Sequence, residues 1–185
     1  TKKIVYRNNA KFNDDIYVTG NLGDSFVGLN ILKKKIKVKK RISDYFINKY
    51  YKPDININFT KTLLKYANTS IDISDGLIDD LKKMINRQYL SYSLNLNKVP
   101  ISKNLTKLIL DKKLYKSKLI SNGDDYQILF TASPNKSRII KNVSRKKGVK
   151  LTKIGKIIPG NVKSSIIDEK GKQIVIKSTG YTHQF

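Results

Sequence analysis

The sequence predicts one domain of the α/β type, in its α+β form, with a mixed β-sheet covered by helices. The 185 residues and a hydrophobic content of 39% are sufficient for a core of ordinary size. Segments with strand-like patterns also alternate with segments of helical spacing. Because no internal repeat and no linker rich in Gly, Ser or Pro divides the chain, residues 1–185 are expected to form a single domain.

The strand candidates are short segments in which apolar or β-branched residues dominate or alternate with polar ones. In order along the chain, they are residues 15–19, 70–73, 92–96, 126–131, 151–158, 165–167 and 173–176. Residues 168–171 lie between the last two segments and have the composition of a turn, so these two segments are predicted to form a hairpin.

The helix candidates have apolar residues at intervals of three and four. In order, they are residues 26–32, 42–51, 57–67, 76–87, 104–111 and a helix that begins at Ser133-Pro134. Phe26, Leu29 and Leu32 are expected to share one face of the first helix, and Ile139, Ile140 and Val143 to point inward from the last. Ser43 or Asp44 is the expected cap of the second helix.

The chain is strongly basic, with 38 Lys and Arg residues, 14 Asp and Glu residues and a formal charge of +24. Such a balance can indicate nucleic-acid binding. Only five of the basic residues are Arg, however, and the Lys residues are spread along the chain among many Ile and Asn residues. This pattern fits a genome rich in A and T, and we do not expect nucleic acid as a partner. Residues 33–41 hold the densest basic run, which we interpret as a solvated helix end rather than a phosphate-binding patch.

Composition also limits the chemistry and the location. The chain has no Cys, which excludes disulfides and thiolate chemistry, and His183 is its only His, which argues against zinc. Hard cations with oxygen ligands, such as Mg²⁺, remain. We find no signal peptide and no apolar run that could cross a bilayer, so a cytoplasmic location without a membrane partner is expected. The chain opens at Thr1 rather than Met, which suggests a piece of a longer protein.

The most informative segment is residues 71–80, which contains four of the 14 acidic residues at a predicted junction between a strand and a helix. Two carboxylates about 5 Å apart repel by roughly 3 kcal/mol at an effective dielectric constant near 20. Ser74 or Asp75 alone could cap the helix, which would leave the other acids unexplained. We therefore interpret the segment as a site for a metal ion and phosphate, with Asp79 and Asp80 as solvated acids of the first helical turn.

Two other segments are ambiguous by themselves. Residues 122–126 contain Asp124 and Asp125 and have good turn chemistry, so the acids gain functional meaning only together with the first cluster. Residues 20–25 resemble a small phosphate loop but lack the Lys of a P-loop. They are better interpreted as a turn with Asp24 or Ser25 capping the next helix.

Taken together and in order, these segments resemble the C-terminal half of the thiamine-monophosphate kinase family, which belongs to the aminoimidazole-ribonucleotide-synthetase-like superfamily. The resemblance runs nearly from end to end and is most specific at residues 67–77. The segments that carry it are 7–20, 22–25, 28–29, 67–77, 123–126, 129–131, 154–155 and Gly180-Tyr181 with His183.

The resemblance implies a reaction in which ATP phosphorylates thiamine monophosphate to thiamine diphosphate with Mg²⁺. It also implies a C-terminal domain of that superfamily as the fold. The implied roles are magnesium binding by Asp72 and Asp75, ATP contact by Ser74 and Arg7, and contact with the thiamine part by Asp124 and Tyr181. No residue is assigned as a catalytic acid or base. The physical logic agrees, since phosphoryl transfer needs charge neutralisation and in-line positioning above all.

The chain departs from the family pattern in two places. Asp124 stands where the family usually has Glu, and Asn122-Gly123 precedes it where the family has two Gly residues. The family's N-terminal half, with further Mg²⁺-binding Asp residues and the usual homodimer interface, is absent from this chain. The isolated fragment is therefore expected to be inactive without its partner half.

Two alternatives remain open at this point. One is a sister enzyme of the same superfamily, such as aminoimidazole ribonucleotide synthetase or selenophosphate synthetase, although the lack of Cys disfavours thiol or selenol chemistry. The other is a basic nucleic-acid-binding module, which a steep loss of DNA affinity with rising salt would support.

Overall fold

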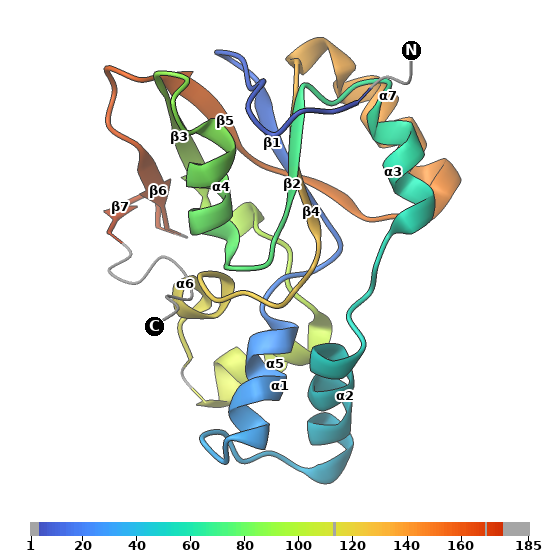
Figure 1. Cartoon of the computed structure of the whole chain (residues 1–185). Helices are drawn as coiled ribbons and strands as arrows, with labels where there is room; N and C mark the ends of the chain where they lie inside the picture. Colours follow the sequence, from blue (N-terminus) through green and yellow to red (C-terminus); the bar gives the residue numbers. More distant parts are fainter. Residues whose placement is uncertain (1–3, 113, 169, 176–185) are drawn as a thin grey trace, which may run out of the picture.

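The computed structural model describes residues 4–112, 114–168 and 170–175, which form a mixed seven-stranded sheet with helices around it (Figure 1). The strands follow one another across the sheet in the order β2-β4-β1-β5-β3-β6-β7. Their bounds are β1 Asp15–Thr19, β2 Thr69–Asp72, β3 Leu90–Asn95, β4 Ile128–Ala132, β5 Leu151–Pro159, β6 Ser165–Ile167 and β7 Gln173–Ile174. The predicted mixed sheet is thereby confirmed.

Most neighbouring strands are antiparallel, and β3 with β6 is the parallel pair. β1 lies between β4 and β5, and the register of its pairing with β5 shifts between Ile16 and Tyr17. β6 and β7 form the predicted antiparallel hairpin, in which the amide of Asp168 donates to the Lys172 carbonyl. β2 is an edge strand and pairs only with β4 within the described part of the sheet.

The α-helices fall into two groups. Their bounds are α1 Asp24–Leu32, α2 Lys40–Tyr51, α3 Ile57–Leu63, α4 Leu77–Ile85, α5 Lys103–Lys112, α6 Lys116–Ile120 and α7 Ser137–Lys147. α1, α2, α5 and α6 gather beyond one end of the sheet, whereas α4 lies on one side of the sheet and α3 and α7 lie on the other (Figure 1). Short 3₁₀ turns at Leu96–Lys98 and Pro134–Lys136 complete the described helical structure.

Alternation along the strands divides the core between the two faces of the sheet. On β1, Ile16 and Val18 pack with Leu77 and Leu81 of α4, while Tyr17 points to the other face. There Tyr17 stacks on Phe130 at a ring separation of 5.2 Å. Successive side chains of a strand point to opposite faces, so each face can bury its own helix layer.

A third apolar cluster holds the four-helix group together, with Val27, Phe46, Leu105, Leu108 and Leu119 as its buried members. The structure differs here from the predicted face of the first helix, because Leu32 is 38% exposed and Val27 is buried instead. Gly28 explains the change. A Cβ atom at Gly28 would overlap the Phe46 carbonyl, so the missing side chain lets α1 and α2 approach closely.

Several predicted details were wrong at helix ends. α2 begins at Lys40, with Lys39 as its N-cap residue and no capping side chain, so neither Ser43 nor Asp44 caps it. α6 was not predicted, because five residues are too few for a helical pattern to be read. Ile140 of α7 is buried as expected, whereas Ile139 is 45% exposed. None of the helices in the described residues is long and apolar enough to span a membrane.

Candidate functional site

The two acidic segments lie against each other. The amide of Asp124 donates to the Ser74 carbonyl at 3.0 Å, and the amide of Tyr126 donates to the Ile73 carbonyl at 2.9 Å. A Cβ atom at Gly123 would overlap the Ser74 carbonyl, so only Gly permits this approach. The chain thus brings residues about fifty positions apart into one site, as the interpretation of the acidic clusters required.

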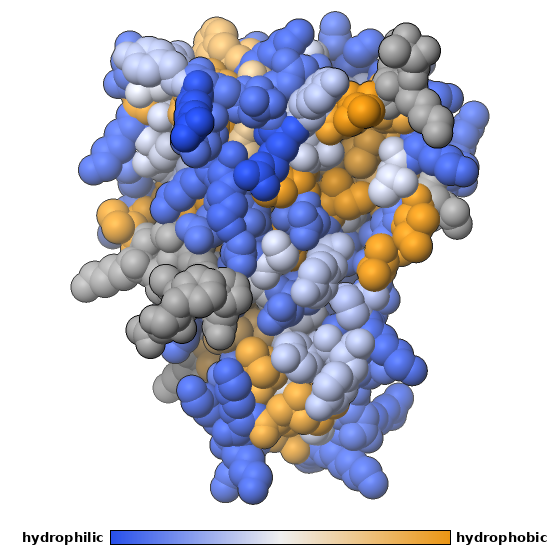
Figure 2. Space-filling view, viewed as in Figure 1, coloured by the Kyte–Doolittle hydropathy of each residue, from blue (hydrophilic) through white to orange (hydrophobic). Residues whose placement is uncertain are grey.

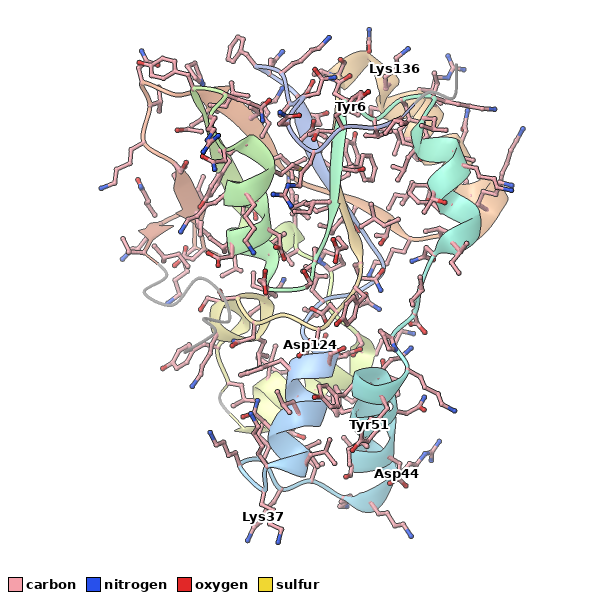
Figure 3. All side chains as sticks on the ribbon, in the orientation of Figure 1. Tyr6, Lys37, Asp44, Tyr51, Asp124 and Lys136 are labelled. Carbon is pink, nitrogen blue, oxygen red and sulfur yellow. The ribbon has the colours of Figure 1, made fainter. Side chains whose placement is uncertain are left out.

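A cavity of about 980 Å³ opens beside this junction, lined by the two loops and by residues in and next to α1, α2 and α6. Its walls combine acids, lysines and aromatic rings with apolar side chains. The acids are Asp75 and Asp124, next to Ser74; the lysines are Lys33, Lys35 and Lys118; and the aromatic residues are Phe26, Tyr50, Tyr115 and Tyr126. Figure 3 shows Asp124 just above α1, where the sheet meets the helices. Such walls suit a ligand that has both a flat ring and charged groups.

The carboxylates of this site influence one another. Burial raises the pKa of Asp124, the negative charge of Asp75 raises it further, and Lys33 opposes the change. Burial likewise raises the pKa of the Tyr126 hydroxyl, with contributions from Asp124, Asp72 and Asp75. The negative charges of Asp72, Asp75 and Asp124 all raise the pKa of this hydroxyl. Asp72 is therefore close enough to the cavity to influence Tyr126 on its wall.

Asp72 itself lies on the outer side of this junction. It is the last residue of edge strand β2, it is exposed, and it lines a separate groove of about 430 Å³ beside α3. The groove is otherwise mostly apolar, with Ile4, Leu63, Leu64 and Ile71 among its walls. Hydrophobic side chains gather in this part of the surface, over α3 (Figure 2). Asp72 and Asp75 are thus close in the sequence but line different pockets. Asp72 lines the groove beside α3, and Asp75 lines the larger cavity.

Asp80 has a role that the sequence interpretation missed. Rather than being a solvated acid, it is 1% exposed, and its Oδ2 atom accepts the amides of Ser74, Asp75 and Gly76 at 3.0, 2.9 and 3.1 Å. Burial raises the pKa of Asp80, while these bonds and Lys83 counteract the shift. The N-cap residue of α4 is Gly76, so neither Ser74 nor Asp75 caps α4, and the structural alternative considered for this segment does not apply.

Lys83 joins Asp80 to Asp75. Its Nζ atom forms an ion pair with Asp75 Oδ2 and lies 3.3 Å from Asp80 Oδ1. The contact with Asp75 is the largest cause of the raised pKa of Lys83. A cation therefore already pairs with one of the two predicted magnesium ligands.

The Gly-containing segment 20–25 is closed to phosphate in this structure. Gly23 is the N-cap residue of α1, and its amide donates to Asp125 Oδ2 at 2.8 Å, so neither Asp24 nor Ser25 caps the helix. Asp24 instead accepts the hydroxyls of Tyr45 and Ser102 at 2.8 and 2.7 Å. The buried Asp125 side chain thus occupies the Gly23 amide, which a phosphate at this helix N-terminus would need.

Two predicted site residues are not part of this group in the described structure. Arg7 is exposed in a turn, next to Tyr6, whose carbonyl accepts the Thr69 hydroxyl at 2.7 Å. Thr69 begins β2 and Asp72 ends it, so Arg7 lies near the opposite end of the strand; Figure 3 shows Tyr6 and Asp124 well apart. Tyr181 lies outside the described residues.

The donor chemistry fits a hard cation only in part. Asp72, Asp75 and Ser74 offer the oxygen atoms that Mg²⁺ prefers. Within the described residues, however, no group of three His, Cys, Asp or Glu side chains is arranged to hold a metal ion. Magnesium bound here would need further ligands, such as water, nucleotide phosphates or groups from another part of the protein.

The chain is similar to known proteins in both sequence and fold. No family model matches it. The thiamine-monophosphate kinase of Buchnera aphidicola subsp. Schizaphis graminum is 38% identical over 184 residues, which cover 98% of this chain and 56% of that protein. The chain therefore spans about half the length of the curated relatives that it matches.

Solved structures agree with this result. The thiamine-monophosphate kinase from Stenotrophomonas maltophilia K279a shares the fold, with a TM-score of 0.79 at 23% identity over 93% of this chain and 54% of that one. AaThiL complexed with AMPPCP and TMP gives a TM-score of 0.78 at 27% identity, over 98% of this chain and 55% of that one. Sequence and fold together show that the chain belongs to the thiamine-monophosphate kinase family.

Proposed function

We propose that this chain is the C-terminal half of an enzyme that uses ATP and Mg²⁺ to phosphorylate thiamine monophosphate. The observation that carries the proposal is the shared cavity, in which Ser74 and Asp75 of one acidic segment face Asp124 of the other. Its aromatic and basic walls suit a ligand with flat rings and a phosphate. The related structure of AaThiL with AMPPCP and TMP supports a nucleotide and a phosphorylated substrate as the ligands.

In this proposal, Asp72 and Asp75 hold magnesium, Ser74 and Arg7 contact ATP, and Asp124 and Tyr181 contact the thiamine part. The cation neutralises phosphate charge when it is bound. Ser74 lines the cavity, and its hydroxyl is a group that suits contact with a phosphate oxygen. Asp124 carries its negative charge into the same cavity, where it favours a cationic ligand ring and an amino group.

The remaining half of the family protein is part of the proposal. The relatives are nearly twice as long as this chain, and of the proposed site residues in the described part of the chain, Arg7 and Asp72 do not line the cavity. We therefore infer that a second half, and a homodimer built through it, completes the site and that this chain alone is inactive. The proposed substrates are water-soluble, which fits the cytoplasmic location expected from the sequence.

The direct test is Asp72→Asn in a protein of full family length that contains this chain. Losing a metal-binding carboxylate removes stabilisation of the transferred phosphate, so Mg²⁺-dependent ATP turnover should fall by roughly 100-fold or more. Asp111→Asn, at an exposed acid of α5, is the matched control and should keep the parent rate. If Asp72→Asn turned over ATP as fast as Asp111→Asn, the metal role of Asp72 would be refuted.

A further inference from the structure

The loop that carries Ser74 and Asp75 is held by a single buried carboxylate. Three successive amides, those of Ser74, Asp75 and Gly76, donate to the same Oδ2 atom of Asp80 at 2.9–3.1 Å. Amides that donate to a charged acceptor form stronger bonds than those between neutral groups. Asp80 is 1% exposed, so water does not replace these bonds easily.

The same helix also holds the side chain of Asp75. Lys83 lies one turn after Asp80 on α4, and its Nζ atom contacts Asp80 Oδ1 and Asp75 Oδ2. Asp80 therefore fixes the backbone of the loop, and Lys83 fixes the carboxylate that the loop presents.

The opposite side of the loop is fixed as well. The Ser74 carbonyl accepts the amide of Asp124 at 3.0 Å, and Gly76 has a φ of 125°, a conformation that side chains rarely permit. With its amides turned inward to Asp80, the loop presents side chains rather than amides to the cavity. This differs from a phosphate loop, in which free amides meet the ligand.

From these contacts we infer that Asp80 is a positioning residue, which holds Ser74 and Asp75 in the geometry that binds a nucleotide and its metal ion. The inference rests on the proposed function, since it assigns Asp80 a task in that same site. Asp80 does not touch the ligand; it acts through the loop. Its neighbour Asp79, on the same helical turn, is the natural comparison.

The first experiment needs no activity. Hydrogen exchange is measured for a peptide covering residues 73–77 in full-length protein that carries Asp80→Ala, Asp80→Asn or Asp79→Asn. Asp80→Ala removes the acceptor, so exchange at residues 74–76 should accelerate by roughly 10-fold or more. Asp80→Asn keeps one carbonyl oxygen and should give a smaller acceleration, whereas Asp79→Asn should match the parent protein. If Asp80→Ala does not fold, Asp80→Asn carries the test.

The second experiment links the loop to the ligand. Calorimetry measures the affinity for AMPPCP in the presence of Mg²⁺, with thermal unfolding of the same samples as the check on global stability. We expect Asp80→Asn to weaken binding by about 10-fold at an unchanged unfolding temperature, and Asp79→Asn to bind like the parent. If the parent protein binds no AMPPCP, the proposed function fails, while the exchange result still decides the structural role of Asp80. If the parent binds and Asp80→Asn binds equally well, or if exchange at residues 74–76 is the same in all variants, the positioning role is overturned.

Discussion

A single residue, Asp124, links the geometry of the site to its choice of ligand. It adopts a left-handed backbone conformation, with φ at 68°, which Asp and Asn tolerate better than most residues. Its neighbour Tyr126 is left-handed too, with φ at 50°. The conformation turns Asp124 into the cavity while its amide stays bound to Ser74. The short Asp side chain therefore suits this backbone.

Asp124→Asn is the sharpest substitution at this scale. Asn keeps the backbone conformation and removes the charge, so folding should be unaffected while the KM for thiamine monophosphate rises. Because a hydrogen bond to a charged group contributes about 1.5–3 kcal/mol, the rise should be roughly 10-fold or more. Steady-state kinetics of the full-length protein give the value, and the KM for ATP serves as the internal comparison. Equal changes in both KM values would contradict a thiamine contact.

At the scale of elements, the site forms where two loops pack against each other. The loop from β2 to α4 and the loop from α6 to β4 exchange backbone hydrogen bonds at Ser74 and Ile73. Gly123 is the point of closest approach, because a side chain there would overlap the backbone of the other loop. The position of Asp124 relative to Asp75 is therefore a property of packed backbone.

Gly123→Ala tests this packing. The added Cβ atom must displace the Ser74 carbonyl, so we expect the free energy of unfolding to fall by about 1–3 kcal/mol, as for other overpacked sites. Gly148→Ala is the control, since its Cβ atom would meet no atom within 4 Å and it tests only the left-handed backbone of the α7 C-cap. Urea unfolding followed by circular dichroism provides both values. A smaller loss for Gly123→Ala than for Gly148→Ala would show that the loops can separate.

Features that depend on local interactions could be predicted from the sequence, whereas features that depend on the path of other segments could not. Residues 165–167 were predicted as a strand with its exact bounds, because a short apolar segment before a turn is a local signal. The buried face of α1 was mispredicted, since Gly28 packs under Phe46 from a different helix. Asp80 was taken for a solvated acid for a different reason, because its partners, the amides of residues 74–76, lie only four to six positions away. Whether an acid in the first helical turn faces water or folds back onto amides depends on the path of the preceding loop, which a helical pattern does not contain.

At the scale of the whole molecule, burial outweighs the large positive charge in its effect on the pKa of several acids. The chain has a formal charge of +24, which by itself favours ionised carboxylates. Yet burial is the largest cause of the raised pKa values of Asp24, Asp80, Asp124 and Asp125. Most of the positive charge lies on Lys side chains at the surface, where solvent screens it, whereas Asp24, Asp80 and Asp125 are buried and Asp124 is half-buried.

Asp125 is the extreme case and leads to a prediction about pH. Burial raises its pKa to about 8 from an ordinary value of 3.8, with a further contribution from Asp24. Between these two values the folded protein holds a proton that the unfolded chain has released. The free energy of unfolding should therefore fall as pH rises from about 4 to about 8, with a slope of up to roughly 1.4 kcal/mol per pH unit from this group, and level off above pH 8.

Asp125→Asn separates this effect from the other acids. Asn is neutral at every pH and keeps a carbonyl oxygen that can accept the Gly23 amide, so the cap of α1 survives while the titration disappears. Urea unfolding at pH 5, 7 and 8.5 should show a shallower decline for Asp125→Asn than for the parent, and Asp111→Asn, at an exposed acid, should retain the parent slope. Part of the decline should persist in Asp125→Asn, because the raised pKa of Asp24 acts in the same direction. An identical slope in the parent and in Asp125→Asn would mean that Asp125 stays ionised in the folded protein, held by the Gly23 amide at the N-terminus of α1.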